Sequence, residues 1–119
     1  IGHGAVLHGC RVKRNAMVGM NAVVMDKAVV GEESIVAAMS FVKAGMVIPP
    51  RSMAIGTPAK VIRELTDEDV RWKSFGTRQY QELSVRSLQT MREVEADREV
   101  QPDRQRIAFD ADGMHKPKA

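Results

Sequence analysis

A spacing of six residues dominates the first half of this sequence. Branched aliphatic residues recur at every sixth position, at Val18, Val24, Val30, Val36, Val42 and Ile48. Small residues follow four positions after the first four of these, at Ala22, Ala28, Ser34 and Ser40. A period of six fits neither an α-helix, at about 3.6 residues per turn, nor a coiled coil, at about 3.5. It is typical of short strands separated by turns, with the branched residue pointing inward and the small residue at a bend.

The repeat frame has one irregular step. Ile1 and Leu7 are six residues apart, and Ala5 fills the small position, but only five residues separate Leu7 from Val12. The pattern is already in phase at Ile1, and the first residue is not methionine. We therefore expect an N-terminally truncated chain whose natural protein begins further upstream.

Three six-residue segments close a triangular coil of about 18 residues, and coils then stack about 4.8 Å apart as parallel strands. Each coil buries its apolar interior only against its neighbours, so stability comes from stacking. The sequence thus predicts a mainly β protein, a parallel β-helix over residues 1–59 that forms the C-terminal part of a longer solenoid. A series of β-hairpins is the alternative, but hairpins alternate with period two and carry Asn-Gly or Asp-Gly turns, which this region lacks.

The repeat frame ends near Pro49 and Pro50, because proline cannot donate to a strand ladder. Helical patterns follow, so residues 60–101 are predicted to be a C-terminal helical segment. Thr66 is a good N-cap for a first helix, and acidic residues at 67–69 favour the helix dipole. Gly76 is predicted to end that helix, and Thr77 to begin a second one.

The predicted second helix has apolar residues at helical spacing. They are Tyr80, Leu83, Leu88, Met91 and Val94. Residues 102–119 form a polar tail in which Ile107 and Phe109 are the only expected anchors.

Composition excludes two classes of partner. The net charge is only +3, and acidic residues lie among the basic ones, so a nucleic-acid-binding stripe is not expected. No apolar run approaches the roughly 20 residues that span a bilayer. The single cysteine, Cys10, cannot form an internal disulfide, which agrees with a cytoplasmic location. Cys10 is expected to be a small buried hydrophobe, with a metal ligand or nucleophile as the alternative.

Two histidines stand out in a G-H-x4-H-G element, His3 and His8. Residues five apart fall on different faces of a triangular coil, and imidazole nitrogens bind zinc at about 2.0–2.1 Å. One chain therefore cannot easily bring both rings to one ion, but two chains side by side can. The spacing predicts a metal site between subunits, with ordinary surface histidines as the alternative.

The segments IGHGAVLHGC, VGMNAVVMD and GTPAKVIREL carry a resemblance to the hexapeptide-repeat family. Within that family, the pattern is similar to the γ-carbonic-anhydrase-like proteins of the PaaY and CaiE type. The resemblance implies a left-handed coil, a homotrimer and a zinc ion held by three histidines at each subunit interface. His3 and His8 match two of those ligands, and the third belongs to an earlier coil that this chain does not contain.

The activity that this resemblance implies is metal-dependent hydrolysis. Zinc lowers the pKa of a bound water to about 7, which suits hydration of carbon dioxide or hydrolysis of a thioester. The PaaY likeness favours a thioesterase acting on acyl-CoA compounds in phenylacetate degradation. Tyr80 could reach a neighbouring site through its hydroxyl, and Lys60 and Arg63 could meet a CoA phosphate, with ordinary surface charges as the alternative.

Two other functions remain open from the sequence. Many hexapeptide proteins transfer acyl groups from CoA with one histidine as general base and no metal, and His8 alone would suffice for that. The third hypothesis is an inert trimeric module, because a chain without its upstream coils would lack part of the site. Metal content separates the first function from the other two.

Overall fold

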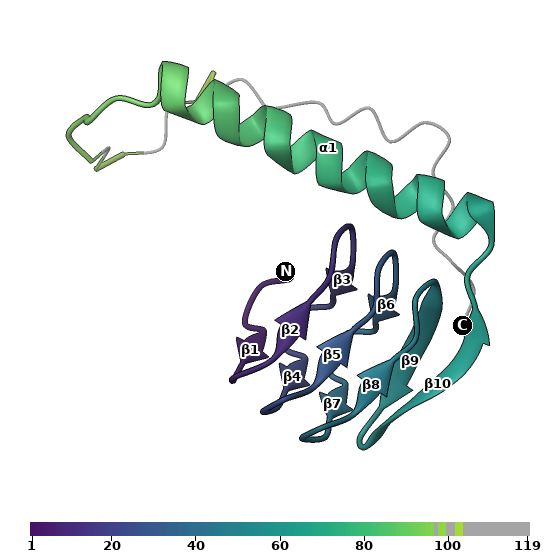
Figure 1. Ribbon diagram of the computed structural model, residues 1–119. Helices are drawn as coiled ribbons and strands as arrows, with labels where there is room; N and C mark the ends of the chain where they lie inside the picture. The colour runs from purple at the N-terminus through teal and green to yellow at the C-terminus, as the bar shows by residue number, and fades with distance from the viewer. Residues whose placement is uncertain (97, 100–101, 104–119) are drawn as a thin grey trace.

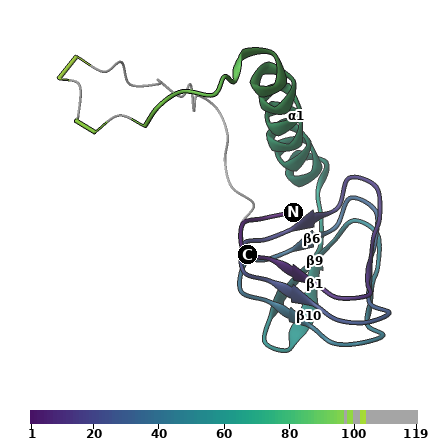
Figure 2. The same ribbon diagram turned by 90° about the vertical axis from the view of Figure 1, so that its left-hand side faces the viewer.

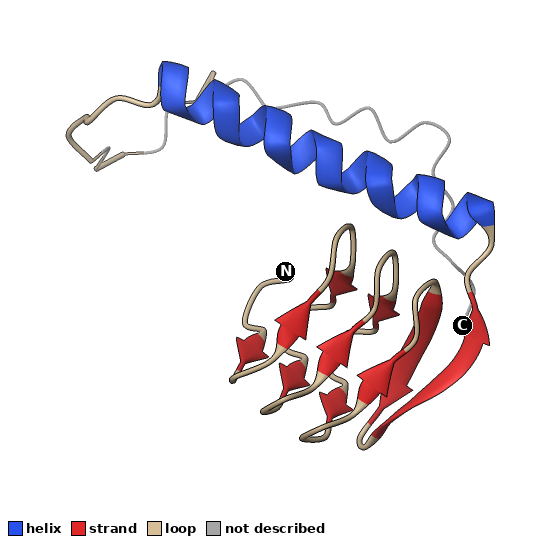
Figure 3. Ribbon diagram, in the orientation of Figure 1, coloured by secondary structure: helices blue, strands red, loops and turns tan. Residues whose placement is uncertain are grey.

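The computed structural model describes residues 1–96, 98–99 and 102–103. Within them the chain forms ten strands and one helix (Figure 1). Eight two-residue strands come first: β1 (Val6–Leu7), β2 (Arg11–Val12), β3 (Met17–Val18), β4 (Val23–Val24), β5 (Val29–Val30), β6 (Ile35–Val36), β7 (Phe41–Val42) and β8 (Val47–Ile48). The longer strands β9 (Ser52–Gly56) and β10 (Ala59–Glu64) precede helix α1 (Asp67–Thr90). The strands stack in rows, and α1 runs along one side of the stack (Figure 3).

The short strands pair in parallel and form the three faces of a triangular coil. Sheet A has the strand order β1-β4-β7, sheet B has β2-β5-β8, and sheet C has β10-β9-β6-β3. Successive strands along the chain belong to successive sheets, so the chain winds around the coil axis (Figure 2). The predicted parallel β-helix is confirmed, and the hairpin alternative is wrong for the repeat region.

The strand register locates the irregular step of the repeat. Arg11 lies opposite Val29, an offset of 18 residues, and the later parallel pairs keep that offset. Val6 lies opposite Val23, an offset of only 17. The corner between β1 and β2, residues 8–10, is therefore one residue shorter than the corner beneath it. This shortened corner carries His8.

The core is one column of branched side chains along the coil axis. The six predicted inward residues, Val18, Val24, Val30, Val36, Val42 and Ile48, are all fully buried. The small positions are also buried, and their hydroxyls have partners: Ser34 Oγ donates to the Pro49 carbonyl at 2.6 Å, and Ser40 Oγ accepts from the Gly56 N–H at 3.2 Å. A column without aromatic residues therefore fills the interior.

The corners between strands use the left-handed backbone region. Six residues other than glycine have positive φ there: Asn15, Asn21, Lys27, Glu33, Met39 and Arg51. Gly4, Gly9 and Gly45 take the same conformation at other corners. A side chain at such a position costs roughly 1–2 kcal/mol, which this fold accepts because every coil needs three tight bends.

The C-terminal region differs from the prediction in three ways. Residues 59–64 form strand β10, antiparallel to β9, so the first part of the expected helical segment is extended instead. Gly76 does not end a helix, and Thr77 does not begin a second one, because α1 continues unbroken through both. A single glycine costs a helix only about 1 kcal/mol, which favourable neighbours on both sides outweigh. The described part of the chain thus has one C-terminal helix.

The beginning of α1 agrees with the prediction. The Thr66 side chain accepts from the Asp69 N–H, and the Asp69 carboxylate accepts from the Thr66 N–H, which completes a capping box. Leu65 and Val70 pack with Ile35 and Met53 over the outer surface of sheet C. The helix is thereby fixed to the coil at its first turns.

A polar junction holds the next turn of α1 against a corner of the coil. Lys73 is only 2% exposed, and its Nζ donates to the Asn15 carbonyl. Asn15 Nδ2 in turn donates to Ser74 Oγ at 2.9 Å. Burial lowers the pKa of Lys73, and the nearby Glu33 carboxylate opposes that shift.

Of the predicted apolar stripe, Tyr80, Leu83 and Leu88 lie on α1, whereas Met91 and Val94 follow its last residue, Thr90, so the prediction of a helix through these two residues is wrong. The stripe is largely exposed in the described part of the chain. Tyr80, Leu88, Met91 and Val94 are 65–88% exposed, and Leu83 is 42% exposed. In the predicted polar tail, the structure describes only residues 102–103, so Ile107 and Phe109 lie outside the described residues.

Candidate metal centre at the edges of sheet A

His3 and His8 lie before and after strand β1, at the two corners of the coil that flank sheet A. His3 occupies the turn that leads into β1, where its carbonyl accepts from the Asn21 N–H at 2.9 Å. His8 directly follows β1, and its N–H donates to the Val24 carbonyl at 2.9 Å. The strand between them thus separates the two rings onto different corners of the coil, as the spacing predicted.

The imidazole of His8 is anchored by a carboxylate from the coil beneath it. His8 Nδ1 lies 2.9 Å from Asp26 Oδ2. An ionised carboxylate can only accept hydrogen bonds, so in a neutral imidazole this contact places the proton on Nδ1 and the lone pair on Nε2. The two side chains are 68% and 48% exposed. The prediction from sequence missed Asp26, which lies 18 residues after His8 in the neighbouring coil.

Close contacts with the next coil explain why glycines lie beside the two histidines. A Cβ on Gly9 would lie 2.5 Å from Asp26 Oδ1, and Gly9 also has a φ of 57°. A Cβ on Gly2 would lie 2.5 Å from the Met20 nitrogen. A Cβ on Gly4, whose φ is 68°, would overlap Asn21 Oδ1. The glycines beside both histidines therefore permit close contact with the next coil.

Comparisons with known proteins point to one class of protein. No protein-family model matches the chain. The carnitine operon protein CaiE of Citrobacter koseri is 53% identical over 107 residues, which cover 90% of this chain and 54% of that protein. CaiE of Salmonella newport is 50% identical over 119 residues, covering all of this chain and 59% of that protein. The chain thus spans a little over half the length of these curated relatives.

Solved structures agree. A candidate acetyltransferase of Bacillus cereus matches with a TM-score of 0.67 and 42% identity, over 71% of this chain and 50% of that one. A hexapeptide transferase family protein of Anaplasma phagocytophilum matches with a TM-score of 0.69 and 38% identity, over 71% of this chain and 51% of that one. The chain is a hexapeptide-repeat protein. Its fold is the left-handed parallel β-helix that the resemblance implied, and its sequence likeness is to CaiE.

The donors that this hexapeptide-repeat protein offers fit zinc in kind. Imidazole nitrogens are common zinc ligands, and a carboxylate behind the ring is a usual second partner of such a ligand. Among the described residues, no group of three or more His, Cys, Asp or Glu side chains comes together to hold an ion within one chain. His3 and His8 could therefore hold a metal only with donors from outside the described chain, such as a second subunit.

Cys10 and Tyr80 are not joined to the two histidines by any interaction of the described residues. Cys10 is half-buried and packs against the core column, which agrees with the small-hydrophobe interpretation. Tyr80 lies on α1 with 65% of its surface exposed, and its carbonyl accepts from Ser84 Oγ. The proposed catalytic contribution of Tyr80 remains a prediction.

The two residues expected to contact CoA, Lys60 and Arg63, both lie on β10, but their surroundings differ. Lys60 is exposed. Arg63 binds the Asp69 carboxylate, with Nη1 2.7 Å from Oδ2 and Nη2 3.2 Å from Oδ1. This ion pair, helped by the Thr66 hydrogen bonds, lowers the pKa of Asp69 to about 2. Arg63 therefore supports the start of α1, and a phosphate contact remains a prediction for both residues.

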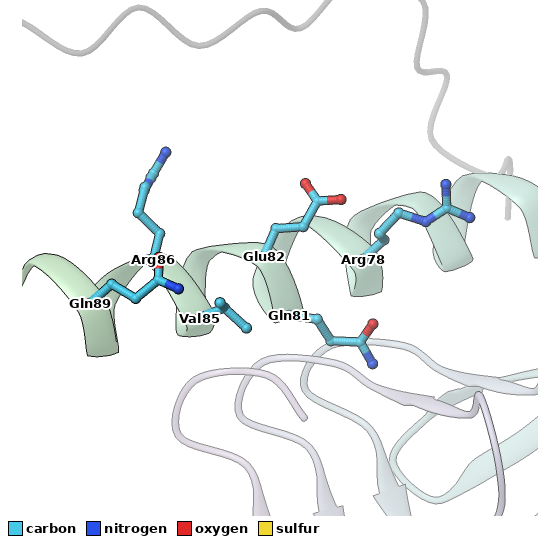
Figure 4. Close-up of a pocket in the computed structure, with 6 residues that line it drawn as sticks. All are labelled: Arg78, Gln81, Glu82, Val85, Arg86 and Gln89. Atoms are coloured by element: carbon cyan, nitrogen blue, oxygen red, sulfur yellow. The ribbon is translucent and has the colours of Figure 1, made fainter.

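A shallow hollow of about 390 Å³ lies along α1 (Figure 4). Its lining comes entirely from that helix: Arg78, Gln81, Glu82, Val85, Arg86 and Gln89. None of the candidate site residues lines it, and side chains of a single exposed helix do not enclose a ligand. We do not assign the site to this hollow.

No helix in the described part of the protein is long and apolar enough to cross a membrane. The charged and polar residues of α1, the one long helix there, account for this result.

Proposed function

We propose that this hexapeptide-repeat protein contributes two imidazole ligands to a divalent-metal site shared between identical subunits, and that the site hydrolyses a thioester of the acyl-CoA class. The observation that supports this most directly is the placement of His3 and His8 at the two corners of the coil that flank sheet A, before and after β1. In a ring of subunits, one of these corners in each copy meets the other corner of its neighbour, so His3 of one copy and His8 of the next can approach one ion. The sequence likeness to CaiE supports this proposal, because the resemblance that suggested a metal site also included CaiE.

In this proposal, different residues of the chain have different roles. His3 and His8 would hold the ion, which supplies Lewis-acid activation of a carbonyl group when bound. The outer surface of sheet A between them carries Val6, Val23 and Phe41. These apolar side chains would limit water around the site, which strengthens electrostatic effects on a bound substrate. The same arrangement suits hydration of carbon dioxide, the first alternative substrate.

The first test is metal content with particle mass. Light scattering and elemental analysis of the full chain should give a trimer with about one zinc ion per chain. His3→Ala and His8→Ala should each lose the metal, because each removes a ligand from every site. His115→Ala, at the third histidine of the chain, is the matched control and should keep it. A metal-free wild-type protein would contradict the metalloenzyme function.

Acyl transfer from CoA is the second candidate function, and a specific observation favours it. The Asp26 carboxylate orients His8 in the manner of a general base, with Nε2 as the proton acceptor. The structural relatives described as a candidate acetyltransferase and as a hexapeptide transferase support this alternative. Protein treated with a strong chelator should then still acylate an amine or hydroxyl acceptor from acetyl-CoA, and His8→Ala should abolish that activity while His3→Ala should not.

The finer assignments rest on resemblance. Phenylacetate degradation, the PaaY likeness and a cytoplasmic location are proposals that accompany the thioesterase function. Assays with phenylacetyl-CoA against acetyl-CoA would test the first of them, since a preference for the aromatic thioester is expected.

A further inference from the structure

We propose that Asp26 is a positioning residue that fixes the tautomer and ring orientation of His8, so that Nε2 is presented to the metal. This inference rests on the proposed metal function, in which His8 is a ligand. It assigns Asp26 and Gly9 to the site, and neither follows from the two histidines alone.

The first support is the direction of the hydrogen bond. His8 Nδ1 lies 2.9 Å from Asp26 Oδ2, and because a carboxylate only accepts, this contact favours the neutral tautomer with the proton on Nδ1 and the lone pair on Nε2. A neutral imidazole with a carboxylate on one nitrogen is a stronger and better-oriented ligand through the other nitrogen. Within the described chain, no interaction engages Nε2, so that atom is available to an ion.

The second support is the local construction of the corner. The corner that carries His8 is one residue shorter than the one that carries Asp26, as the 17-residue offset between β1 and β4 shows. The Lys27 N–H donates to the Gly9 carbonyl at 2.8 Å, which ties the two corners together. The shorter corner thus holds the ring directly over the carboxylate.

The third support is the glycine that follows His8. A Cβ at position 9 would lie 2.5 Å from Asp26 Oδ1, so any side chain there would displace the carboxylate. Gly45 occupies the same kind of corner, with a φ of 71°, but a Cβ there would meet nothing within 4 Å. Both positions impose similar backbone strain on alanine, but only a Cβ at position 9 would meet the Asp26 carboxylate. Gly45 contacts Asp26 through the backbone alone, where its N–H donates to the Asp26 carbonyl at 2.8 Å, so Gly45→Ala is the control for backbone strain.

A role in folding does not explain the pair well. Both side chains are about half exposed or more, and exposed polar pairs contribute little to stability even when both partners are charged. Removal of the carboxylate should therefore affect the ring of His8 rather than the fold. This expectation allows stability and site function to be measured separately.

The first experiment reads the ring of His8 directly in the metal-free full chain. Nitrogen NMR of the imidazole is recorded at a pH well above the ordinary histidine pKa of about 6.5, where the ring is neutral. The wild type should show the proton on Nδ1. Asp26→Ala should move much of the population to the tautomer with the proton on Nε2, and an unchanged spectrum would overturn the proposal.

The second experiment measures zinc affinity by competition with a chromophoric chelator. Asp26→Ala and Gly9→Ala should each weaken binding by about 10–100-fold, the usual range for loss of a ligand's outer partner. Gly45→Ala and Glu32→Gln should stay within about threefold of wild type, because Glu32 is an exposed carboxylate on another corner. Circular dichroism and light scattering confirm that all four variants fold and assemble alike.

The outcomes separate the two proposals. Equal losses in Gly9→Ala and Gly45→Ala would attribute the effect to backbone strain and overturn the role of Asp26. A wild-type protein that binds no zinc would overturn both the proposed metal function and the metal part of this inference. In that case the ring spectra still decide whether Asp26 sets the tautomer of His8, which the acyl-transfer alternative also requires.

Discussion

At the scale of single residues, position in the repeat decides whether a side chain matters for stability. The two residues of each short strand point in opposite directions, so one fills the core and its neighbour faces outward. In sheet B, for example, Val30 is fully buried, whereas Val47 is 65% exposed in the adjacent strand. Two identical side chains in one sheet therefore have very different environments.

This difference gives a direct prediction. Val30→Ala should lower the free energy of unfolding by about 2–3 kcal/mol, because it removes buried methyl groups and leaves a cavity in the column. Val47→Ala makes the same chemical change at an exposed site and should cost less than about 0.5 kcal/mol. Urea denaturation of both variants measures the difference, and similar losses would contradict the inward assignment of Val30.

Residue-level prediction from sequence succeeded for the column and failed for the second partner of His8. The inward valines repeat regularly, so spacing alone identifies them. Asp26 belongs to no repeat of its own, and its importance depends on the coil above. The short step between Leu7 and Val12 was visible in the sequence, but the local 17-residue offset between β1 and β4 that accompanies it was not. The physical reason is that a shortened corner changes which residues face one another.

At the scale of elements, a small polar network supports the start of α1. Arg63 from β10 and Thr66 at the cap both bind Asp69, which is only 8% exposed. These partners stabilise the ionised carboxylate, so the pKa of Asp69 falls to about 2 in the folded protein. The unfolded chain has no such partners, and its Asp pKa remains near 3.9.

The lowered pKa makes the helix contribution depend on pH. Because the folded state favours the charged form, the stabilisation is complete above about pH 4 and disappears as the pH falls through about 2. Wild type should therefore exceed Asp69→Asn by about 2 kcal/mol in unfolding free energy near neutral pH. The gap should close between about pH 4 and pH 2, and a gap that does not change with pH would contradict the assignment to the carboxylate.

The helix itself shows what local signals can and cannot decide. The cap at Thr66 was predictable because several neighbouring residues favour the same boundary. Gly76 lies in open space within α1, and its backbone is helical like that of its neighbours. A lone glycine resembles a stop in sequence, but only its backbone conformation distinguishes a stop from a tolerated interior residue.

At the scale of the whole molecule, the three faces of the coil are not equivalent. Sheet C is covered by Leu65 and Val70, so its outward residues Ile35 and Met53 are 3% and 6% exposed. Sheet A has no such cover from the described chain, and its outward residues are apolar. Sheet B carries the exposed Arg11. Sheet A is therefore the face best suited to a second copy of the chain.

A charge placed on sheet A tests this assignment. Phe41→Glu should reduce the particle mass from trimer to monomer in light scattering, because a carboxylate would be buried without a partner at the subunit contact. Val47→Glu puts the same charge on the outward surface of sheet B and should leave the trimer intact. Zinc content should fall together with the mass in the first variant only.

The separation of His8 from Asp26 by 18 residues also bears on how such a chain can change length in evolution. An insertion of one whole turn of other sequence adds a complete set of strands, corners and inner side chains, so the coil lengthens without a change of shape. If the insertion falls after residue 48, the histidine and its carboxylate remain neighbours. If it falls between residues 8 and 26, the two groups move apart by one further layer of about 4.8 Å, and the pair is broken. The scaffold should therefore accept a whole-turn insertion at many positions, whereas the contact between His8 and Asp26 restricts where such an insertion leaves the pair intact.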